Sequence, residues 1–204
     1  MGTVGEGVAR LLVKNRNLIA SRVGAKVNLK RVADIDESRS TKVPLETGVF
    51  TTAALNVVED PDIQIVLEMI GGQTIAKELI VKAMENGKHV VTANKALLAN
   101  QGRELFEKAD DCDVDIAFEP SVGGCMPIIK LVRESLVGNR IGDMTGILNG
   151  TCNYILTRIA EKGLSFESAL AEAQANGLAE ADPTMDVDGF DTAHKLAILT
   201  CLAY

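Results

Sequence analysis

Between residues 26 and 118, short apolar runs alternate with longer stretches of helical periodicity, and this alternation restricts the fold more than any other feature of the chain. Short apolar runs of this kind are typical of parallel strands that are buried on both faces. Strands that alternate with helices build a parallel sheet covered by helices on both sides. The sequence therefore predicts an α/β fold. The expected strands span 26–36, 63–69, 88–92 and 114–118, and the expected helices between them span 74–86 and 96–109.

The chain opens on a glycine turn that leads directly into a helix. Gly2 and Gly5 form the pattern G-x-x-G, which is the second half of the G-x-G-x-x-G loop that binds dinucleotide phosphates. The first half of that loop, and the strand that should precede it, are missing. Small residues also begin many ordinary helices, so the pattern has a plain alternative. Together with the Gly2–Gly5 pattern, the alternation of strands and helices predicts a Rossmann-like parallel sheet whose first strand is missing.

Polar and glycine residues follow the first two expected strands. Asp34 and Asp36 lie where dinucleotide-binding folds hold the adenosine ribose. Arg39 is close enough to favour a 2′-phosphate, so both NAD and NADP stay open. Gly71 and Gly72 end the second expected strand, at the sheet edge where ligands of such folds bind. A polar strand end without function is the alternative.

Two later turns carry unusual residues. The segment Thr92–Lys95 puts a lysine at a strand's carboxyl end, where the start of a helix normally favours acids. The segment Glu119–Pro127 is a tight glycine turn whose backbone carbonyls, with Glu119 at its mouth, suit a hard cation. A surface lysine and a plain strand–helix turn are the alternatives.

The sequence changes character after Pro127, which indicates a second unit beginning near residues 120–127. We expect one domain at 1–119 and a second at 120–204, the latter part of an α+β domain. Gly177 should end one of its helices as a C-terminal cap. The other expected elements are helix 127–137, strand 141–148, a helix ending near Lys162, helix 165–176 and a helix from about Asp188, which would be its cap.

Five carboxylates precede Lys195 in the stretch 180–195. Asp191 and Lys195 are four residues apart, so a helix places them on one face. One interpretation is a solvated acidic loop with a surface ion pair. The other is a site for a small zwitterion, with carboxylates for its ammonium group and a lysine for its oxygen. The stretch alone does not decide between them.

Composition excludes several classes of function. The net charge is −7 without a basic run, which argues against nucleic acid and anionic membranes as partners. No apolar run approaches the length of a membrane span. The four cysteines never form a C-x-x-C pair, so we expect neither a zinc site nor a disulfide framework, and we expect a reducing cytoplasm.

Six segments, taken together and in order, resemble the homoserine dehydrogenases. That family interconverts L-aspartate 4-semialdehyde and L-homoserine with NAD or NADP, on the route to threonine and methionine. The resemblance extends over essentially all 204 residues and implies a dinucleotide-binding domain, a substrate-binding and dimerisation domain, and a homodimer. The segments are Gly2–Gly5, Thr92–Lys95, Glu119–Gly124, Asn149–Thr151, Gly177–Pro183 and Asp188–Lys195.

The resemblance also implies roles for single residues. Lys195 would give the proton to the aldehyde oxygen, and Lys95 would lie beside the nicotinamide and the substrate. Glu180 and Asp191 would hold the ammonium and polar groups of homoserine. The cofactor would contact Gly2, Thr3, Val4, Gly5, Asp36, Gly71, Lys95 and Gly177. A structural sodium or potassium ion would be held by Glu119 and the carbonyls of Val122, Gly124 and Met126.

The chain departs from the family in three places. The family's first strand and first glycine are absent, Cys125 stands where members usually have a glycine, and the family continues beyond Tyr204. We therefore expect residues 1–204 alone to have weak or no activity. One alternative is an inactive nucleotide-binding or oligomerisation fragment of such an enzyme. Another is an acylating semialdehyde dehydrogenase, which would need a nucleophilic cysteine with a partner histidine.

Overall fold

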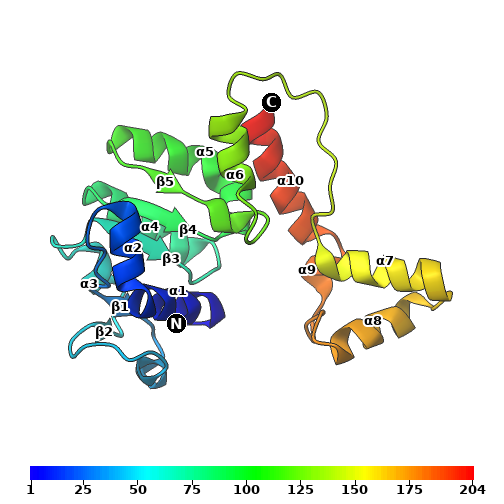
Figure 1. Ribbon diagram of the computed structural model, residues 1–204, viewed down its shortest axis with the longest axis horizontal. Coiled ribbons are helices and arrows are strands. Elements are labelled where there is room, and N and C mark those ends of the chain that lie inside the picture. Colours follow the sequence, from blue (N-terminus) through cyan, green and yellow to red (C-terminus); the bar gives the residue numbers. More distant parts are fainter. The chain divides into compact units, whose positions relative to one another are not determined.

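The computed structural model describes every residue from Met1 to Tyr204, and these residues form two compact units. Unit 1 comprises Met1–Phe118 and unit 2 comprises Glu119–Tyr204 (Figure 1). No helix of either unit has both the length and the apolarity needed to cross a bilayer.

Unit 1 contains two separate parallel sheets (Figure 1). β1 (Val32–Ala33) pairs with β2 (Phe50–Thr51), and the other sheet has the order β3 (Ile65–Glu68), β4 (His89–Thr92), β5 (Ile116–Ala117). A doubly wound sheet has the strand order 3-2-1-4-5-6. β1 and β2 correspond to its strands 2 and 3, and β3, β4 and β5 correspond to its strands 4, 5 and 6. The interruption therefore falls at the first strand, and the predicted α/β class with a missing first strand is confirmed.

The longer helices of unit 1 carry buried apolar stripes, and α4 packs against β3 and β4. In α4 and α5 the buried residues recur at helical spacing, and full burial of one Ile or Leu side chain stabilises the fold by about 1.5–3 kcal/mol. α4 buries Ile80 and Met84, and α5 buries Leu97 and Leu105. The helices are α1 (Thr3–Lys14), α2 (Arg16–Val23), α3 (Leu55–Val58), α4 (Thr74–Glu85) and α5 (Lys95–Asp111), with a short 3-10 helix η1 (Glu37–Thr41).

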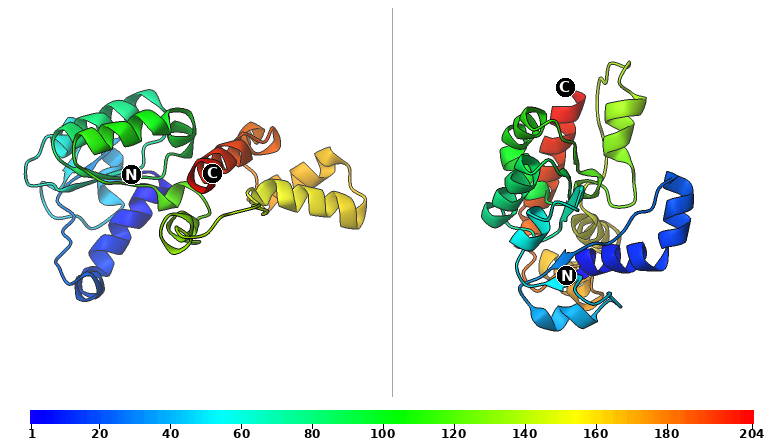
Figure 2. Two further views of the ribbon diagram at one scale, coloured as in Figure 1. Left: turned by 90° about the horizontal axis from the view of Figure 1, so that it is seen from above. Right: turned by 90° about the vertical axis from the view of Figure 1, so that its left-hand side faces the viewer.

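All regular elements of unit 2 are helices. α7 and α8 form a hairpin around a core of Ile155, Ala169 and Ala173, and they lie side by side in the left-hand view of Figure 2. The α-helices are α6 (Ile128–Lys130), α7 (Gly150–Lys162), α8 (Phe166–Ala175), α9 (Thr184–Val187) and α10 (Phe190–Ala203). A 3-10 turn η2 (Glu119–Ser121) precedes α6, and a π-helical turn η3 (Leu131–Ser135) follows it.

Three predicted elements differ from the structure. The strand expected at 141–148 is irregular, because unit 2 offers no strand with which its backbone groups can pair. The helix expected at 127–137 breaks into α6 and the π-turn η3 and ends at Ser135. The strand expected at 26–36 is reduced to Val32–Ala33.

The predicted cap of the last helix is also wrong. Gly189, not Asp188, is the N-cap of α10, and its φ of 80° lies in the left-handed region that glycine adopts without strain. Gly177, by contrast, follows α8 with a φ of 69°, so the prediction that it ends this helix is confirmed.

The turn at 119–127 contains a strained residue. Cys125 has a φ of 66°, in the region that costs a residue with a Cβ atom roughly 1–2 kcal/mol. We expect Cys125→Gly to raise the free energy of unfolding of unit 2 by about 1 kcal/mol, measured by urea denaturation. The matched change Cys201→Gly, inside α10, should lower it, because glycine weakens a helix interior. A lower stability of Cys125→Gly would contradict the strain.

Candidate active site

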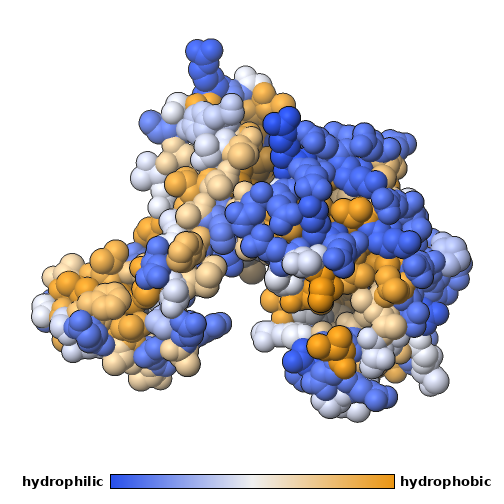
Figure 3. Space-filling model, turned by 180° about the vertical axis from the view of Figure 1, so that it is seen from behind, coloured by the Kyte–Doolittle hydropathy of each residue, from blue (hydrophilic) through white to orange (hydrophobic).

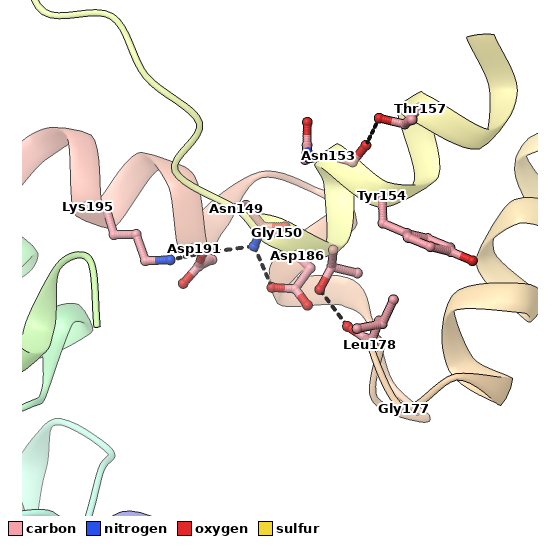
Figure 4. Close-up of a pocket in the computed structure, with 11 residues that line it drawn as sticks. Asn149, Gly150, Asn153, Tyr154, Thr157, Gly177, Leu178, Asp186, Asp191 and Lys195 are labelled. Atoms are coloured by element: carbon pink, nitrogen blue, oxygen red, sulfur yellow. Dashed lines mark hydrogen bonds and ion pairs between the residues drawn. The ribbon is translucent and has the colours of Figure 1, made fainter. Parts of the chain in front are cut away.

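Unit 2 contains an open cleft of ≈ 690 Å³ beside the N-terminal end of α7 (Figure 4). Its charged side chains are Asp186, Asp191 and Lys195, so two carboxylates face one ammonium group. The remaining lining residues are Asn149, Gly150, Thr151, Asn153, Tyr154, Thr157, Gly177 and Leu178. An excess of negative charge in a cleft attracts a cationic group of a small molecule.

Asp191 and Lys195 form an ion pair at the first turns of α10. Lys195 Nζ lies 2.7 Å from Asp191 Oδ2 and also donates to the carbonyl oxygen of Leu148 at 2.7 Å. The side chain of Lys195 is only 19% exposed, and that of Asp191 only 7%. The predicted arrangement on one helix face is confirmed, but the pair is largely withdrawn from solvent and is no ordinary surface ion pair. A lysine ammonium has three protons, and these bonds use two of them.

Asn149 joins the N-terminus of α7 to the acidic residues. Its Oδ1 accepts from the backbone N–H of Cys152 at 2.8 Å, which makes it the N-cap of α7. Its Nδ2 donates to Asp186 Oδ1 at 2.7 Å and to Asp191 Oδ2 at 2.8 Å (Figure 4). No role was predicted for Asn149 from the sequence. Asn-Gly-Thr ahead of an apolar helix signals a cap, but no local signal predicts its contacts with distant acids.

Cys152 does not fit the alternative of an acylating semialdehyde dehydrogenase. Its thiol donates to the carbonyl oxygen of Asp186 at 3.0 Å. Burial raises the pKa of the Cys152 thiol, and the charges of Asp186 and Asp191 raise it further. A nucleophilic cysteine needs a lowered pKa and a cationic neighbour, and here the neighbours are acidic.

The structure does not bring Glu180 to the cleft. Its side chain is exposed and is not among the lining residues, and its backbone carbonyl accepts from Gln174 Nε2 at 3.0 Å. Gly177, which was expected near the cofactor, does line the cleft. The hydroxyl of Thr151 holds Leu178, the residue after Gly177, because it donates to the Leu178 carbonyl oxygen at 2.8 Å.

The N-terminus of α1 in unit 1 is open. Its N-cap, Gly2, makes no side-chain capping bond, and the first helical hydrogen bond runs from the Glu6 N–H to the Gly2 carbonyl at 2.8 Å. The N–H groups of Thr3, Val4 and Gly5 therefore have no partner within the helix. A Cβ atom on Gly2 would meet nothing within 4 Å. Such an end fits a pyrophosphate, which bare N–H groups and the helix dipole stabilise.

A buried carboxylate organises the carboxyl ends of β3 and β4. Glu68 accepts from the N–H groups of Ile70 and Gly71 at 2.8 and 3.2 Å, and from the Thr92 hydroxyl at 2.6 Å. Asn94 caps α5 and donates to the carbonyl oxygen of Gly72. These bonds fix the Gly71–Gly72 turn next to the start of α5. The first residue of that helix is Lys95, so it lies at the sheet edge as expected.

Asp36 is held by its own turn at the end of β1. Its carboxylate accepts from the N–H of Ser38 at 3.1 Å and from the hydroxyl at 2.6 Å, and it pairs with Arg39 at 3.2 Å. The hydrogen bond from the Ser38 side chain lowers the pKa of Asp36. Asp36, which was expected to bind the ribose, and Arg39, which was expected to favour a 2′-phosphate, are thus paired with each other in this structure.

The turn at 119–127 wraps around the start of α6. The two carboxylate oxygens of Glu119 accept from the N–H groups of Ile129 and Lys130, both at 3.0 Å. The carbonyl of Met126 accepts from the N–H of Ile128 at 2.8 Å. Each of these oxygens keeps a lone pair, and carboxylate and carbonyl oxygens are the ligand type that a hard cation prefers.

Parallel strands in the order of a doubly wound sheet, alternating with helices and combined with an open helix N-terminus, place unit 1 in the class of dinucleotide-binding domains. The family model for the NAD-binding domain of homoserine dehydrogenase matches residues 1–119, and the model for homoserine dehydrogenase itself matches residues 127–204. The chain belongs to the homoserine dehydrogenase family.

Individual relatives agree with the family models. The homoserine dehydrogenase of Pseudomonas aeruginosa is 48% identical over all of this chain, which covers 46% of that protein. The crystal structure of the Thiobacillus denitrificans enzyme has a TM-score of 0.92 at 45% identity, with 100% of this chain and 47% of that one covered. A hyperthermophilic archaeal homoserine dehydrogenase in complex with NADPH has a TM-score of 0.83 at 27% identity, with 100% and 67% covered. The chain spans about half the length of the curated relatives it matches.

Asp34, at the end of β1, gives unit 1 a predictable dependence on pH. Burial alone raises the pKa of Asp34, but hydrogen bonds from the Met1 ammonium group, the Asp36 N–H and Arg39 outweigh it and lower the pKa to about 2. Its unfolded pKa is near 3.9, so the ionised form stabilises the fold above about pH 4, and this contribution is lost as the pH falls toward about 2.

We expect Asp34→Asn to lower the free energy of unfolding of unit 1 by about 2 kcal/mol at pH 7. The difference from wild type should shrink as the pH falls below about 4. Urea titrations at a series of pH values measure both. The control is Asp62→Asn, since Asp62 pairs with Lys30 at an exposed position and should change stability little. A difference that stays constant down to about pH 2.5 would contradict the assignment.

Proposed function

We propose that the protein carrying this chain interconverts L-aspartate 4-semialdehyde and L-homoserine with NAD or NADP. The observation that carries the proposal is the Lys195 ammonium, held 2.7 Å from Asp191 in a cleft with an excess of carboxylates. Membership of the homoserine dehydrogenase family supports it. So does the NADPH complex of the similar archaeal enzyme.

A nicotinamide cofactor, when bound, supplies or accepts the hydride. The N–H groups at the start of α1 would hold its pyrophosphate, Asp36 its ribose, and Gly71 would give the backbone room at the sheet edge. Lys95 is proposed to act beside the nicotinamide, because it begins α5 at the carboxyl edge of the parallel sheet. Gly177 is proposed as a further contact of the cofactor.

The cleft of unit 2 would hold the amino acid. Asp191 is the proposed partner of its ammonium group, and Asp186 adds a second carboxylate inside the cleft. As the aldehyde is reduced, its oxygen gains negative charge. The third N–H of Lys195 stabilises that charge and then transfers its proton to the oxygen, which leaves the alcohol and a neutral amine. Asp191 and the Leu148 carbonyl keep the amine aimed at this oxygen.

We expect Lys195→Ala in the full-length protein to lower kcat by about 10²–10⁴-fold, because the general acid is lost. The oxidation of NADPH and NADH with aspartate semialdehyde is followed by absorbance. Lys162→Ala is the matched control, since Lys162 is exposed at the end of α7 and outside the cleft. Near-normal turnover by Lys195→Ala would show that another group supplies the proton.

We also propose that Glu119 and the carbonyls of Val122, Gly124 and Met126 hold a sodium or potassium ion. An ion bound at several times its dissociation constant should raise the melting temperature by about 2–4 °C. Thermal unfolding in sodium, potassium and choline chloride at equal ionic strength measures this. The difference should vanish in Glu119→Gln and persist in Glu134→Gln, an exposed change on η3. Equal melting temperatures in all three salts would refute the site.

We also propose that the full-length protein is a cytoplasmic homodimer whose subunits meet through unit 2. Exposed apolar side chains gather on the α7–α8 hairpin, among them Leu156 and Phe166 (Figure 3). Such a patch is typical of an interface between subunits. Sedimentation equilibrium that finds only monomers of the full-length protein would exclude the dimer.

A further inference from the structure

Asn149 has more contacts than its role as a helix cap requires. Capping α7 takes one acceptor, its Oδ1, which binds the N–H of Cys152. Serine, threonine and aspartate cap helices about as well. Of the common capping residues, only asparagine adds an NH₂ group with two donors. Here both donors point away from α7, one to Asp186 on α9 and one to Asp191 on α10.

Asp191 Oδ2 is shared between Asn149 and Lys195. The amide of Asn149 donates to this oxygen at 2.8 Å, and the Lys195 ammonium donates to the same oxygen at 2.7 Å (Figure 4). The ammonium also donates to the carbonyl of Leu148, the residue directly before Asn149. Residues 148 and 149 therefore contact the lysine twice, once directly and once through Asp191.

The amide also keeps two carboxylates together. Asp186 and Asp191 converge on the same nitrogen, and Asp191 is buried. Two carboxylates that approach each other without a shared donor repel, and a buried one loses the water that would otherwise stabilise it. The NH₂ group of Asn149 supplies a donor to each of them. A carboxylate in its place would add a third negative charge at this point.

We propose that Asn149 is a positioning residue for the reaction: it fixes Asp191, and through Asp191 the Lys195 ammonium, in the orientation needed to protonate the aldehyde oxygen. This inference rests on the proposed function for its catalytic meaning. The hydrogen-bond geometry that supports it does not depend on that function.

The variants Asn149→Ser and Asn149→Asp test this, because both keep an oxygen that caps α7 and both remove the amide NH₂ group that reaches Asp186 and Asp191; the shorter serine carries only its hydroxyl. In the full-length protein, kcat with L-homoserine should fall about 10–100-fold in Asn149→Ser and further in Asn149→Asp, since small displacements of a catalytic group have effects of this size. The KM for the nicotinamide cofactor should stay within about two-fold, because a positioning residue of the amino-acid cleft leaves cofactor binding unchanged.

A second measurement does not need turnover. Competitive acetylation of lysines at limiting acetic anhydride, read by peptide mass spectrometry, reports how firmly the Lys195 amine is held. We expect Lys195 to react about ten-fold faster in Asn149→Ser, in line with the expected loss of turnover. Asn149→Asp is not used for the labelling, because its added carboxylate attracts the Lys195 ammonium and protects it from acetylation. The exposed Lys162 should react at the wild-type rate. If wild type does not convert homoserine at all, the proposed function fails, whereas the labelling still decides the role of Asn149.

Ser165→Ala provides the control for the loss of a cap alone. Ser165 is the N-cap of α8 in the same unit, accepts from Ser168 and lies outside the cleft. Its removal should lower the melting temperature without changing the Lys195 labelling. Should Asn149→Asp fail to fold, Asn149→Ser decides alone. If Asn149→Ser labels and turns over like wild type, Asn149 is only a helix cap and the proposal is wrong.

Discussion

The ion pair between Asp191 and Lys195 is the interaction on which the cleft depends. Both groups are largely removed from water, and a buried ion pair offsets that cost only when further hydrogen bonds satisfy the remaining donors and acceptors. The Leu148 carbonyl and the Asn149 amide provide such bonds. The start of α7, the short helix α9 and the first turns of α10 are therefore held together by polar contacts, in addition to the packing of Val187 of α9 against the apolar core of the hairpin.

Unit 1 also contains a buried carboxylate that is satisfied by hydrogen bonds, and it lies at the edge of the sheet. Glu68 is a buried carboxylate, and its three donors come from the Gly71 turn and from Thr92. A buried acid satisfied in this way fixes backbone geometry more rigidly than apolar packing, because each hydrogen bond has a direction. The result places the N-terminus of α5, and with it Lys95, at the carboxyl ends of the strands.

The parts of the site that sequence reasoning predicted are local ones. Asp191 and Lys195 share a helix face at a spacing of four, and the strand–helix alternation predicts the sheet edge that carries Lys95. The contacts of Asn149 were not predicted, because its partners lie 37 and 42 residues away in the sequence. The strand expected at 141–148 failed for a related reason: an apolar run becomes a strand only where another strand can pair with it. Both depend on long-range contacts that periodicity does not contain.

The divided sheet of unit 1 has a consequence for how these residues behave in solution. β3 pairs with β4 alone and β1 with β2 alone, so each has an edge of backbone groups without a neighbouring strand. The side chains of Ile65 and Leu67 on β3 are also solvent-exposed. An unpaired strand edge with exposed apolar side chains is a template for strands of other chains. The element that leads to the Gly71 turn therefore also offers backbone groups to which a further strand could pair.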